Sequence, residues 1–474
     1  FERCWKEDAR FMDQSGSDRV MELIKKSRFS VGELDVFDSV IFVDSEESFL
    51  VSVKNGTTLC MTTDCAKEVL RGEVSDDLAF VLIQRGMAAY RASRSVSHTD
   101  AHVFPIFFLI DLTKKCSLRC VYCFRELSEE SPVMDHAVLA SICDELIGYC
   151  KKINSDHVTI QPWGGEPMLE FMSILYTRSR FTEAGMHPKI TIETNATLIT
   201  PEKAKLLYEN DIEVGVSIDG CAEVHNVQRP FENGAPSLQA VEKGISNLRS
   251  AGYKNIFSIT VVTKNTIERL DDIIRYYAFE LKLNGIKLNL MRKTDRNREL
   301  APDPNQIEGY VEELISCMKN CFERKAEIIE HNISQRLRNL TCRPCDNICN
   351  AHGCHGGYRM LSIDAKGDVY PCELSDDPSY RIGHIGDKGF VEMVVEAIEN
   401  RHEYFLPREL DGCSECPWFF YCRGGCRAAV KYDCGDPRKV DKTECLLNKA
   451  LYPRLVSILL NEPDFAQYLL NGRV

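Results

Sequence analysis

The sequence predicts an α/β protein with several parts, and three observations point to it. Between about residues 111 and 291, short apolar or β-branched runs alternate with amphipathic stretches, which is typical of strands and helices in a parallel sheet. The first hundred residues alternate instead as short strands joined by turns. Eleven of the 22 cysteines fall between Cys342 and Cys445. We therefore expect an α+β domain at residues 1–100, an α/β domain at 101–300, a helical bridge at 301–340 and a cysteine-rich domain at 341–474.

The N-terminal part is predicted to hold three strands followed by two helices. The strands are Ser39–Val43, Ser48–Val53 and Thr57–Met61, and the helices are Thr63–Arg71 and Ser75–Arg85. The segment Lys54-Asn55-Gly56 suits the turn between the second and third strands. An exposed edge strand of such a sheet can pair with an extended peptide, main chain to main chain.

The central part is predicted to hold six strands, each followed by a helix or turn. The strands are Ile106–Asp111, His157–Gln161, Lys189–Glu193, Glu213–Ile218, Ile256–Val262 and Gly285–Leu290. The helices include Asp135–Lys151 and Pro201–Asn210, and in the bridge Gln306–Glu330. Because the carboxyl ends of parallel strands share one edge of the sheet, we expect functional side chains to gather there.

Composition excludes several classes of function. A net charge of −13 argues against a nucleic-acid partner, since phosphate binding needs a surplus of Lys and Arg. The sequence has no apolar run long enough to span a membrane and no signal-peptide pattern at its start. Many cysteines in C-x2-C spacing, without a secretion signal, indicate metal ligation in a reducing cytoplasm rather than disulfides.

Three cysteines directly after the first central strand carry the strongest functional signal. Cys116, Cys120 and Cys123 have the spacing C-x3-C-x2-C. Three thiolates on one loop can hold three irons of a [4Fe–4S] cluster and leave the fourth iron open for another ligand. The alternative is structural zinc, which prefers four ligands in short pairs, and the nearest histidines, His102 and His136, are poorly placed for it.

This spacing, with the aromatic Tyr122 before the third cysteine and a strand before the loop, resembles the radical S-adenosylmethionine (SAM) enzymes. The resemblance implies a partial (β/α)6 barrel like an open TIM barrel. It also implies that the open iron chelates SAM, and that the reduced cluster cleaves SAM to a 5′-deoxyadenosyl radical. The electron would come from a donor such as flavodoxin or ferredoxin.

The resemblance extends to residues at the ends of the later strands. Gly164-Gly165-Glu166, before Pro167, is similar to the family's GGEP motif, which hydrogen-bonds the SAM amino group. By the same resemblance Ser217, Asp219 and Asn195 bind the SAM ribose, and Arg229 binds its carboxylate, which suits the forked guanidinium. The alternative for Asn195 and Asp219 is turn formation through local backbone bonds.

The cysteines of the tail resemble the seven-cysteine SPASM domain of peptide-modifying radical SAM enzymes. The resemblance assigns Cys413, Cys416, Cys422 and Cys445 to an outer auxiliary [4Fe–4S] cluster, and Cys354, Cys372 and Cys426 to an inner one. The fourth ligand of the inner cluster is Cys342, Cys345 or Cys349, with Cys349 at the favoured spacing, or else an iron left open for a substrate thiolate. A zinc knuckle remains the alternative for Cys413 to Cys426 taken alone.

Together these features predict a radical SAM/SPASM maturase of a ribosomally made precursor peptide. The N-terminal part resembles the small winged-helix domain that recognises the leader segment of such peptides, although a plain stabilising domain remains possible. The most favoured reaction is a thioether crosslink to a peptide cysteine. Formylglycine formation, as in anaerobic sulfatase maturation, is the first alternative, and there Glu373 after Cys372 would take the catalytic place that an aspartate holds. Carbon–carbon crosslinking and a non-catalytic metal scaffold are the others.

Overall fold

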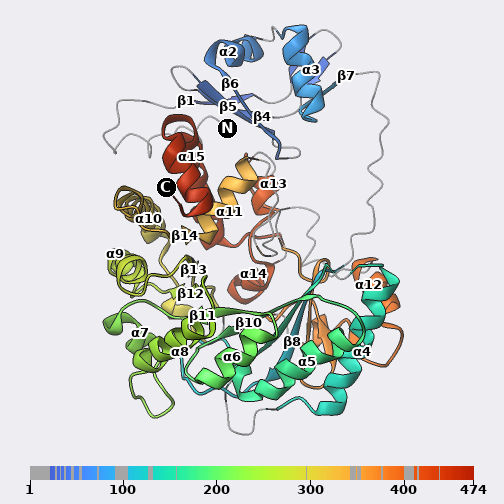
Figure 1. Ribbon diagram of the computed structural model, residues 1–474. Coiled ribbons are helices and arrows are strands. Elements are labelled where there is room, and N and C mark those ends of the chain that lie inside the picture. The colour runs from blue at the N-terminus through green and yellow to red at the C-terminus, as the bar shows by residue number, and fades with distance from the viewer. Residues whose placement is uncertain are drawn as a thin grey trace.

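The computed structural model describes most of the chain, and Figure 1 shows its arrangement. The described residues are 22–26, 29–31, 34–36, 39–43, 47–52, 56–71, 74–90, 105–125, 127, 132–155, 157–294, 296–341, 349, 354–374, 377–399, 410–413, 416–436 and 438–473. Lys54, Asn55, Cys342 and Cys345, which figure in the predictions above, lie outside them.

The centre of the molecule is the predicted parallel α/β sheet, which confirms the fold class. Its six successive strands are β8 (Phe107–Thr113), β9 (Thr159–Gly164), β10 (Lys189–Thr194), β11 (Ile212–Ser217), β12 (Phe257–Val262) and β13 (Gly285–Leu290). They pair in sequence order, all parallel. The helices that follow them along the chain are α4 (His136–Lys152), α5 (Phe171–Glu183), α6 (Pro201–Glu209), α7 (Ala222–Gln228), α8 (Leu238–Ala251) and α9 (Leu270–Arg275). These helices lie along the outer side of the sheet (Figure 1).

Local sequence explains where these helices begin and end. Asp135 caps α4 by accepting a hydrogen bond from the Ala137 amide at 2.7 Å. Thr200 caps α6 in the same way, and Pro201 suits the first helical position. Gly252 ends α8 with a left-handed φ of +118°, which favours glycine.

The sheet is larger than the six strands that the sequence predicts. The bridge does not form one helix from Gln306 to Glu330, because α10 (Ile307–Glu323) ends early and β14 (Ile329–Glu330) pairs with β13. The buried Glu330 carboxylate accepts amide hydrogen bonds from Leu288 and Ile333, so it joins the sheet to α11 (His331–Leu340). An apolar pattern that continues past the end of α10, through the buried Ala326 and Ile328, explains the error.

The cysteine-rich tail also contributes strands to the sheet. β15 (Met360–Ile363) pairs in parallel with β8, and β16 (Asp368–Tyr370) and β17 (Gly383–His384) continue antiparallel from it. The tail's helices are α12 (Phe390–Glu399), α13 (Phe419–Cys422), α14 (Arg427–Cys434), α15 (Lys442–Asn461) and α16 (Pro463–Asn471). In Figure 1 α13 and α15 lie between the central sheet and the N-terminal domain.

The N-terminal domain is a small antiparallel sheet with two helices. The three predicted strands are β4 (Ser39–Val43), β5 (Glu47–Ser52) and β6 (Thr58–Thr62), and the helices are α2 (Thr63–Arg71) and α3 (Asp76–Gln84). β1 (Glu22–Lys26) adds to the other side of β4, and β2 (Phe29–Val31), β3 (Leu34–Val36) and β7 (Ala88–Tyr90) form a second sheet.

The two faces of the N-terminal sheet have different partners. Ile41 and Leu50 belong to the domain's own core with residues of α2 and α3. Phe42 stacks on Trp418 of the tail, with ring centroids 5.4 Å apart. The Tyr421 hydroxyl donates to the Gly56 carbonyl, so the tail holds the N-terminal domain in place. None of the helices that the structure describes has the length and apolarity that a membrane span requires.

Candidate functional site

The three-cysteine loop lies at the carboxyl end of β8 and is held by neighbouring loops. The Arg119 amide donates to the Pro230 carbonyl at 2.8 Å, and the Val121 amide to the Gln228 carbonyl at 2.9 Å. Leu118 forms an isolated antiparallel bridge with Phe231. The loop after β8 is therefore fixed by the segment that follows α7.

The glycines after β9 let that strand approach the cysteine loop closely. Gly164 and Gly165 each have a loop carbonyl where a Cβ atom would lie: a Cβ would be 2.3 Å from the Thr113 oxygen at Gly164 and 2.3 Å from the Lys115 oxygen at Gly165. The Gly165 amide also donates to the Thr113 carbonyl at 2.7 Å. Any side chain at either position would push β9 and the cysteine loop apart.

Glu166 lies inside the protein, and its carboxylate is fully used there. It is 1% exposed. It accepts hydrogen bonds from the Met168 amide at 3.0 Å, the Thr194 hydroxyl at 2.6 Å and the Asn195 amide at 2.8 Å. Burial raises the pKa of Glu166, and these hydrogen bonds oppose the rise. The carboxylate thus ties the end of β9 to the end of β10.

Asn195 continues this chain of contacts to the cysteine loop. Its side-chain Nδ2 donates to Ser117 Oγ at 3.1 Å and lies 3.9 Å from Cys116 Sγ. Its side-chain Oδ1 accepts hydrogen bonds from the amide and the hydroxyl of Thr197. The side chain therefore orients Cys116 in this structure.

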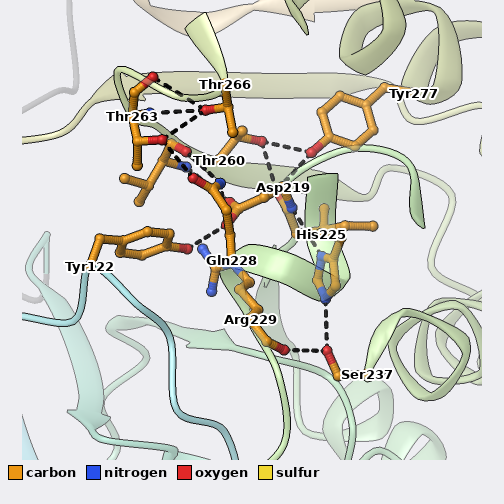
Figure 2. Close-up of polar contacts among 12 residues, drawn as sticks. Tyr122, Asp219, His225, Gln228, Arg229, Ser237, Thr260, Thr263, Thr266 and Tyr277 are labelled. Atoms are coloured by element: carbon orange, nitrogen blue, oxygen red, sulfur yellow. Dashed lines mark hydrogen bonds and ion pairs between the residues drawn. The ribbon is translucent and has the colours of Figure 1, made fainter. Parts of the chain in front are cut away.

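Asp219 is the centre of a second buried network, which Figure 2 shows. Its Oδ1 accepts from the Val261 amide at 3.0 Å. Its Oδ2 accepts from the Tyr122 hydroxyl at 2.5 Å and Gln228 Nε2 at 3.1 Å, and it pairs with Arg229 Nε at 2.8 Å. Both oxygens of Asp219 are occupied, and the side chain is 0% exposed.

The network holds Arg229 beside Tyr122 of the cysteine loop. The guanidinium lies over the Tyr122 ring, 5.4 Å from its centroid. His225 supports the turn by accepting the Asp219 amide hydrogen at 3.1 Å and contacting Ser237 Oγ at 3.0 Å. Ser217, at the end of β11, keeps partial exposure, and no described residue hydrogen-bonds its hydroxyl.

Burial raises the pKa of two of the loop thiols. It raises the pKa of Cys116 to about 11, and it raises the pKa of Cys120 to about 12 against the opposing charge of Arg229. Thiols in such surroundings become thiolates only when a cation binds them. A soft-donor loop of this kind fits an iron–sulfur cluster.

Part of the cysteine-rich tail gathers beside the sheet. Cys349, Cys354 and Cys372 pack in one apolar cluster with Leu109 of β8. Burial is the main cause of the raised pKa of Cys426, and the charge of Cys354 adds to the rise. The structure thus brings together the four described cysteines of the proposed inner set. Glu373, beside Cys372, has a buried Oε2 without a hydrogen-bond partner among the described residues.

The outer set converges around α13 and the start of α15. Burial raises the pKa of Cys413 to about 11, and the charges of Cys416 and Cys445 add to the rise. Burial also raises the pKa of Cys422, and the charges of Glu444 and Cys445 add to the rise. Among the described residues no three His, Cys, Asp or Glu side chains lie close enough to hold one metal ion. Four thiols gathered in this way can hold a [4Fe–4S] cluster, with one thiolate on each iron.

Three charged residues near these sites, Glu193, Lys287 and Arg292, escaped the sequence analysis. Burial is the main cause of the raised pKa of Glu193, at the end of β10. The positive charges of Lys287 and Arg229 oppose the rise, and the charge of Glu373 adds to it. Arg292 follows β13, and its pKa is raised by the charges that Cys426 and Cys349 carry when ionised. Their only signal in the sequence is a charge on or just after a predicted core strand.

The comparisons with known proteins agree with this geometry. A model of the Radical SAM superfamily matches residues 110–277, and a SPASM model, described as an iron-sulfur cluster-binding domain, matches residues 354–417. The chain is 26% identical over 378 residues to a cysteine-type anaerobic sulfatase-maturating enzyme of Clostridium perfringens. The match spans 73% of this chain and 96% of that protein. The chain is also 26% identical over 350 residues to the mycofactocin maturase of Mycolicibacterium smegmatis, covering 72% and 83%.

Solved structures show the same fold. The chain superposes on native anSMEcpe with bound AdoMet with a TM-score of 0.65 and 21% identity, covering 75% of this chain and 100% of that one. For Streptococcus suis SuiB bound to precursor peptide SuiA the TM-score is 0.54 and the identity 17%, covering 84% and 96%. The chain therefore carries a radical SAM domain and a SPASM domain, with the sulfatase-maturating enzyme and the mycofactocin maturase among its relatives, and its cofactors are SAM and [4Fe–4S] clusters.

Proposed function

We propose that this enzyme modifies a ribosomally made precursor peptide and joins a peptide cysteine to a carbon through a thioether. The observation that carries the proposal is the position of Glu193. Two charges from different sites shift the pKa of its carboxyl group: Arg229, beside the cysteine loop, lowers it, and Glu373, beside the inner cysteine set, raises it. Glu193 thus lies within electrostatic reach of both sites, and the proposal is that a substrate at the carboxyl edge of the sheet reaches both.

We assign the first cluster to Cys116, Cys120 and Cys123, and contacts to SAM to the Gly165 backbone, Ser217 and the terminal nitrogens of Arg229. When bound, these cofactors supply a radical that removes hydrogen from an unactivated carbon. A one-electron donor such as flavodoxin or ferredoxin would reduce the first cluster.

The structure changes the roles that we propose for three other residues. Glu166, Asn195 and Asp219 use their polar atoms within the protein. We therefore propose that they position the cysteine loop and Arg229, rather than bind SAM directly.

The tail would hold the auxiliary clusters. We assign Cys413, Cys416, Cys422 and Cys445 to the outer one, and Cys354, Cys372 and Cys426 to the inner one, with Cys349 as the favoured fourth position. A thioether fits an inner set beside an acidic residue, because forming the bond would pass one hydrogen atom from carbon to the 5′-deoxyadenosyl radical, one proton from the thiol to a base and one electron to an oxidised auxiliary cluster. Glu373 is the candidate acceptor of that proton.

The N-terminal domain would bind the leader segment of the peptide. Among the described strands β6 lies at one edge of its sheet, where an extended segment can add as a further strand. Structures of related enzymes hold a peptide, either a substrate peptide with AdoMet or the precursor SuiA.

The test is to incubate the reconstituted enzyme, SAM and a reductant with synthetic Cys-containing peptides translated from short reading frames that flank this gene. Thioether formation predicts 5′-deoxyadenosine, a loss of two hydrogens per crosslink and one fewer thiol that iodoacetamide can alkylate. Formylglycine would instead remove the sulfur from a cysteine. A carbon–carbon crosslink would give the same mass loss but leave every thiol alkylatable, and either result would replace the thioether.

A further inference from the structure

Arg292 is half-buried and differs from two buried arginines nearby. Arg229 pairs with Asp219 at 2.8 Å, and Arg336 pairs with Glu444 at 2.5 Å. No described residue forms a hydrogen bond or an ion pair with Arg292. A guanidinium that is partly removed from water is stabilised by a nearby negative charge.

The chain holds Arg292 against α14. The next residue, Lys293, forms an ion pair with Asp433 of α14 at 3.4 Å. Arg298 donates to the carbonyls of Tyr432 and Asp433 at the end of the same helix. The segment after β13 is thus fixed along α14, whose N-terminal cap is Cys426.

One cavity connects Arg292 with the surroundings of Cys426. Its lining includes Arg292, Ala429 of α14 and Asp441. Asp441 in turn accepts a hydrogen bond from the Cys426 amide at 3.3 Å. No cysteine belongs to this lining, so the cavity lies beside the inner cysteines rather than among them.

The sulfur atoms of two cysteines lie within electrostatic reach of Arg292. Once ionised, Cys426 would raise the pKa of Arg292 more than any other group, followed by Cys349, Asp441 and Glu444. Arg292 is likewise the foremost charge that acts on each of the two thiols. Cys426 and Cys349 belong to the proposed inner set.

We infer that Arg292 is a positioning residue whose guanidinium compensates the negative charge of the inner auxiliary cluster and sets its reduction potential. The inference depends on the ligand assignment under the proposed function. A [4Fe–4S] cluster held by thiolates carries net negative charge, and nearby charge and hydrogen bonds set its potential. A fixed positive charge favours the reduced form, which is more negative by one unit.

The experiment uses reconstituted full-length protein in which Cys116, Cys120 and Cys123 are alanine, so that only auxiliary clusters remain. Into this background we place Arg292→Gln, Arg292→Lys and, as the matched control, Lys293→Gln. Lys293→Gln removes the same charge one residue away, where the side chain pairs with Asp433. Potentiometric titration followed by EPR gives the potential of each cluster, and iron analysis gives the loading.

The inference predicts that Arg292→Gln lowers the potential of one auxiliary cluster, while Arg292→Lys stays closer to the parent and Lys293→Gln matches it. Loss of about four irons per chain in Arg292→Gln, but not in Arg292→Lys, would support the same role of the charge. Unchanged potentials at full loading in Arg292→Gln would overturn the inference alone. Equal damage by both Arg292 variants would also overturn it, because the charge would then not matter. A parent without any auxiliary EPR signal would overturn the ligand assignment as well.

Discussion

The cysteine loop after β8 and the cysteine-rich tail are built in different ways. The loop takes its three thiols from eight consecutive residues, and networks around Glu166 and Asp219 hold its neighbours. The tail gathers its cysteines from separate segments, held mainly by packing and helix ends. The comparison teaches that hydrogen-bond networks among the described residues organise the radical site, whereas apolar packing brings the inner cysteines of the tail together.

The largest expected effect separates the two regions by function. Cys120→Ala should reduce SAM cleavage to background, because two thiolates no longer hold the first cluster. Cys422→Ala should leave SAM cleavage within about tenfold of wild type but abolish product, since the outer cluster is not needed to form the radical. Chromatography of 5′-deoxyadenosine and mass spectrometry of the peptide measure both. Equal loss of SAM cleavage in the two variants would break the comparison.

The next effect concerns the organisation of the radical site. Asp219→Ala should cost about 3–5 kcal/mol of stability, because it leaves the Arg229 charge buried and unpaired. Urea unfolding of the cluster-free protein measures this free energy. Thr263→Val is the control, since it removes only outlying hydrogen bonds of the Thr263 hydroxyl, with Gln228 at 2.9 Å and Thr266 at 3.2 Å, and should cost about 1–2 kcal/mol. Similar costs in the two variants would show that Asp219 does not organise the network.

A comparable but smaller effect is expected where the tail holds the N-terminal domain. Trp418→Ala should cost about 3 kcal/mol, because the buried indole stacks on both Phe42 and Tyr452. Limited proteolysis should then release the N-terminal domain faster. Val227→Ala, at a side chain 69% exposed, serves as the control and should leave the rate unchanged. An unchanged rate in Trp418→Ala would mean that other contacts suffice.

The smallest effect is a dependence on pH at the radical site. Burial lowers the pKa of His225 to about 4, and the charge of Asp219 only partly opposes this. Between pH 6.5 and about 4 the unfolded chain binds a proton that the folded chain rejects, so stability falls as the pH falls through this window. The loss should reach about 2–3 kcal/mol at pH 4. His225→Gln should flatten the dependence of unfolding on pH, and an equally steep curve would exclude His225 as its cause.

The same contrast explains what the sequence could predict. The cysteine loop, Gly164 and Gly165, and Arg229 come at or after the ends of β8, β9 and β11 of one parallel sheet, so the order of the chain was enough to bring them to one edge. Sequence could not show that Asp219 and Asn195 use their polar atoms inside the protein, because those partners come from other strands. β15 joins β8 across more than two hundred residues, and the charged groups Glu193, Lys287 and Arg292 look like ordinary strand residues until the fold is known.

The most direct test of the account is the iron content of the reconstituted protein in which Cys116, Cys120 and Cys123 are alanine, measured beside wild type. Two independent auxiliary clusters predict about eight irons per chain in the variant and about twelve in wild type, with matching sulfide. Retention of zinc instead of iron in the tail, or loss of all iron from the variant, would contradict the division into a radical site and a separate tail with its own clusters.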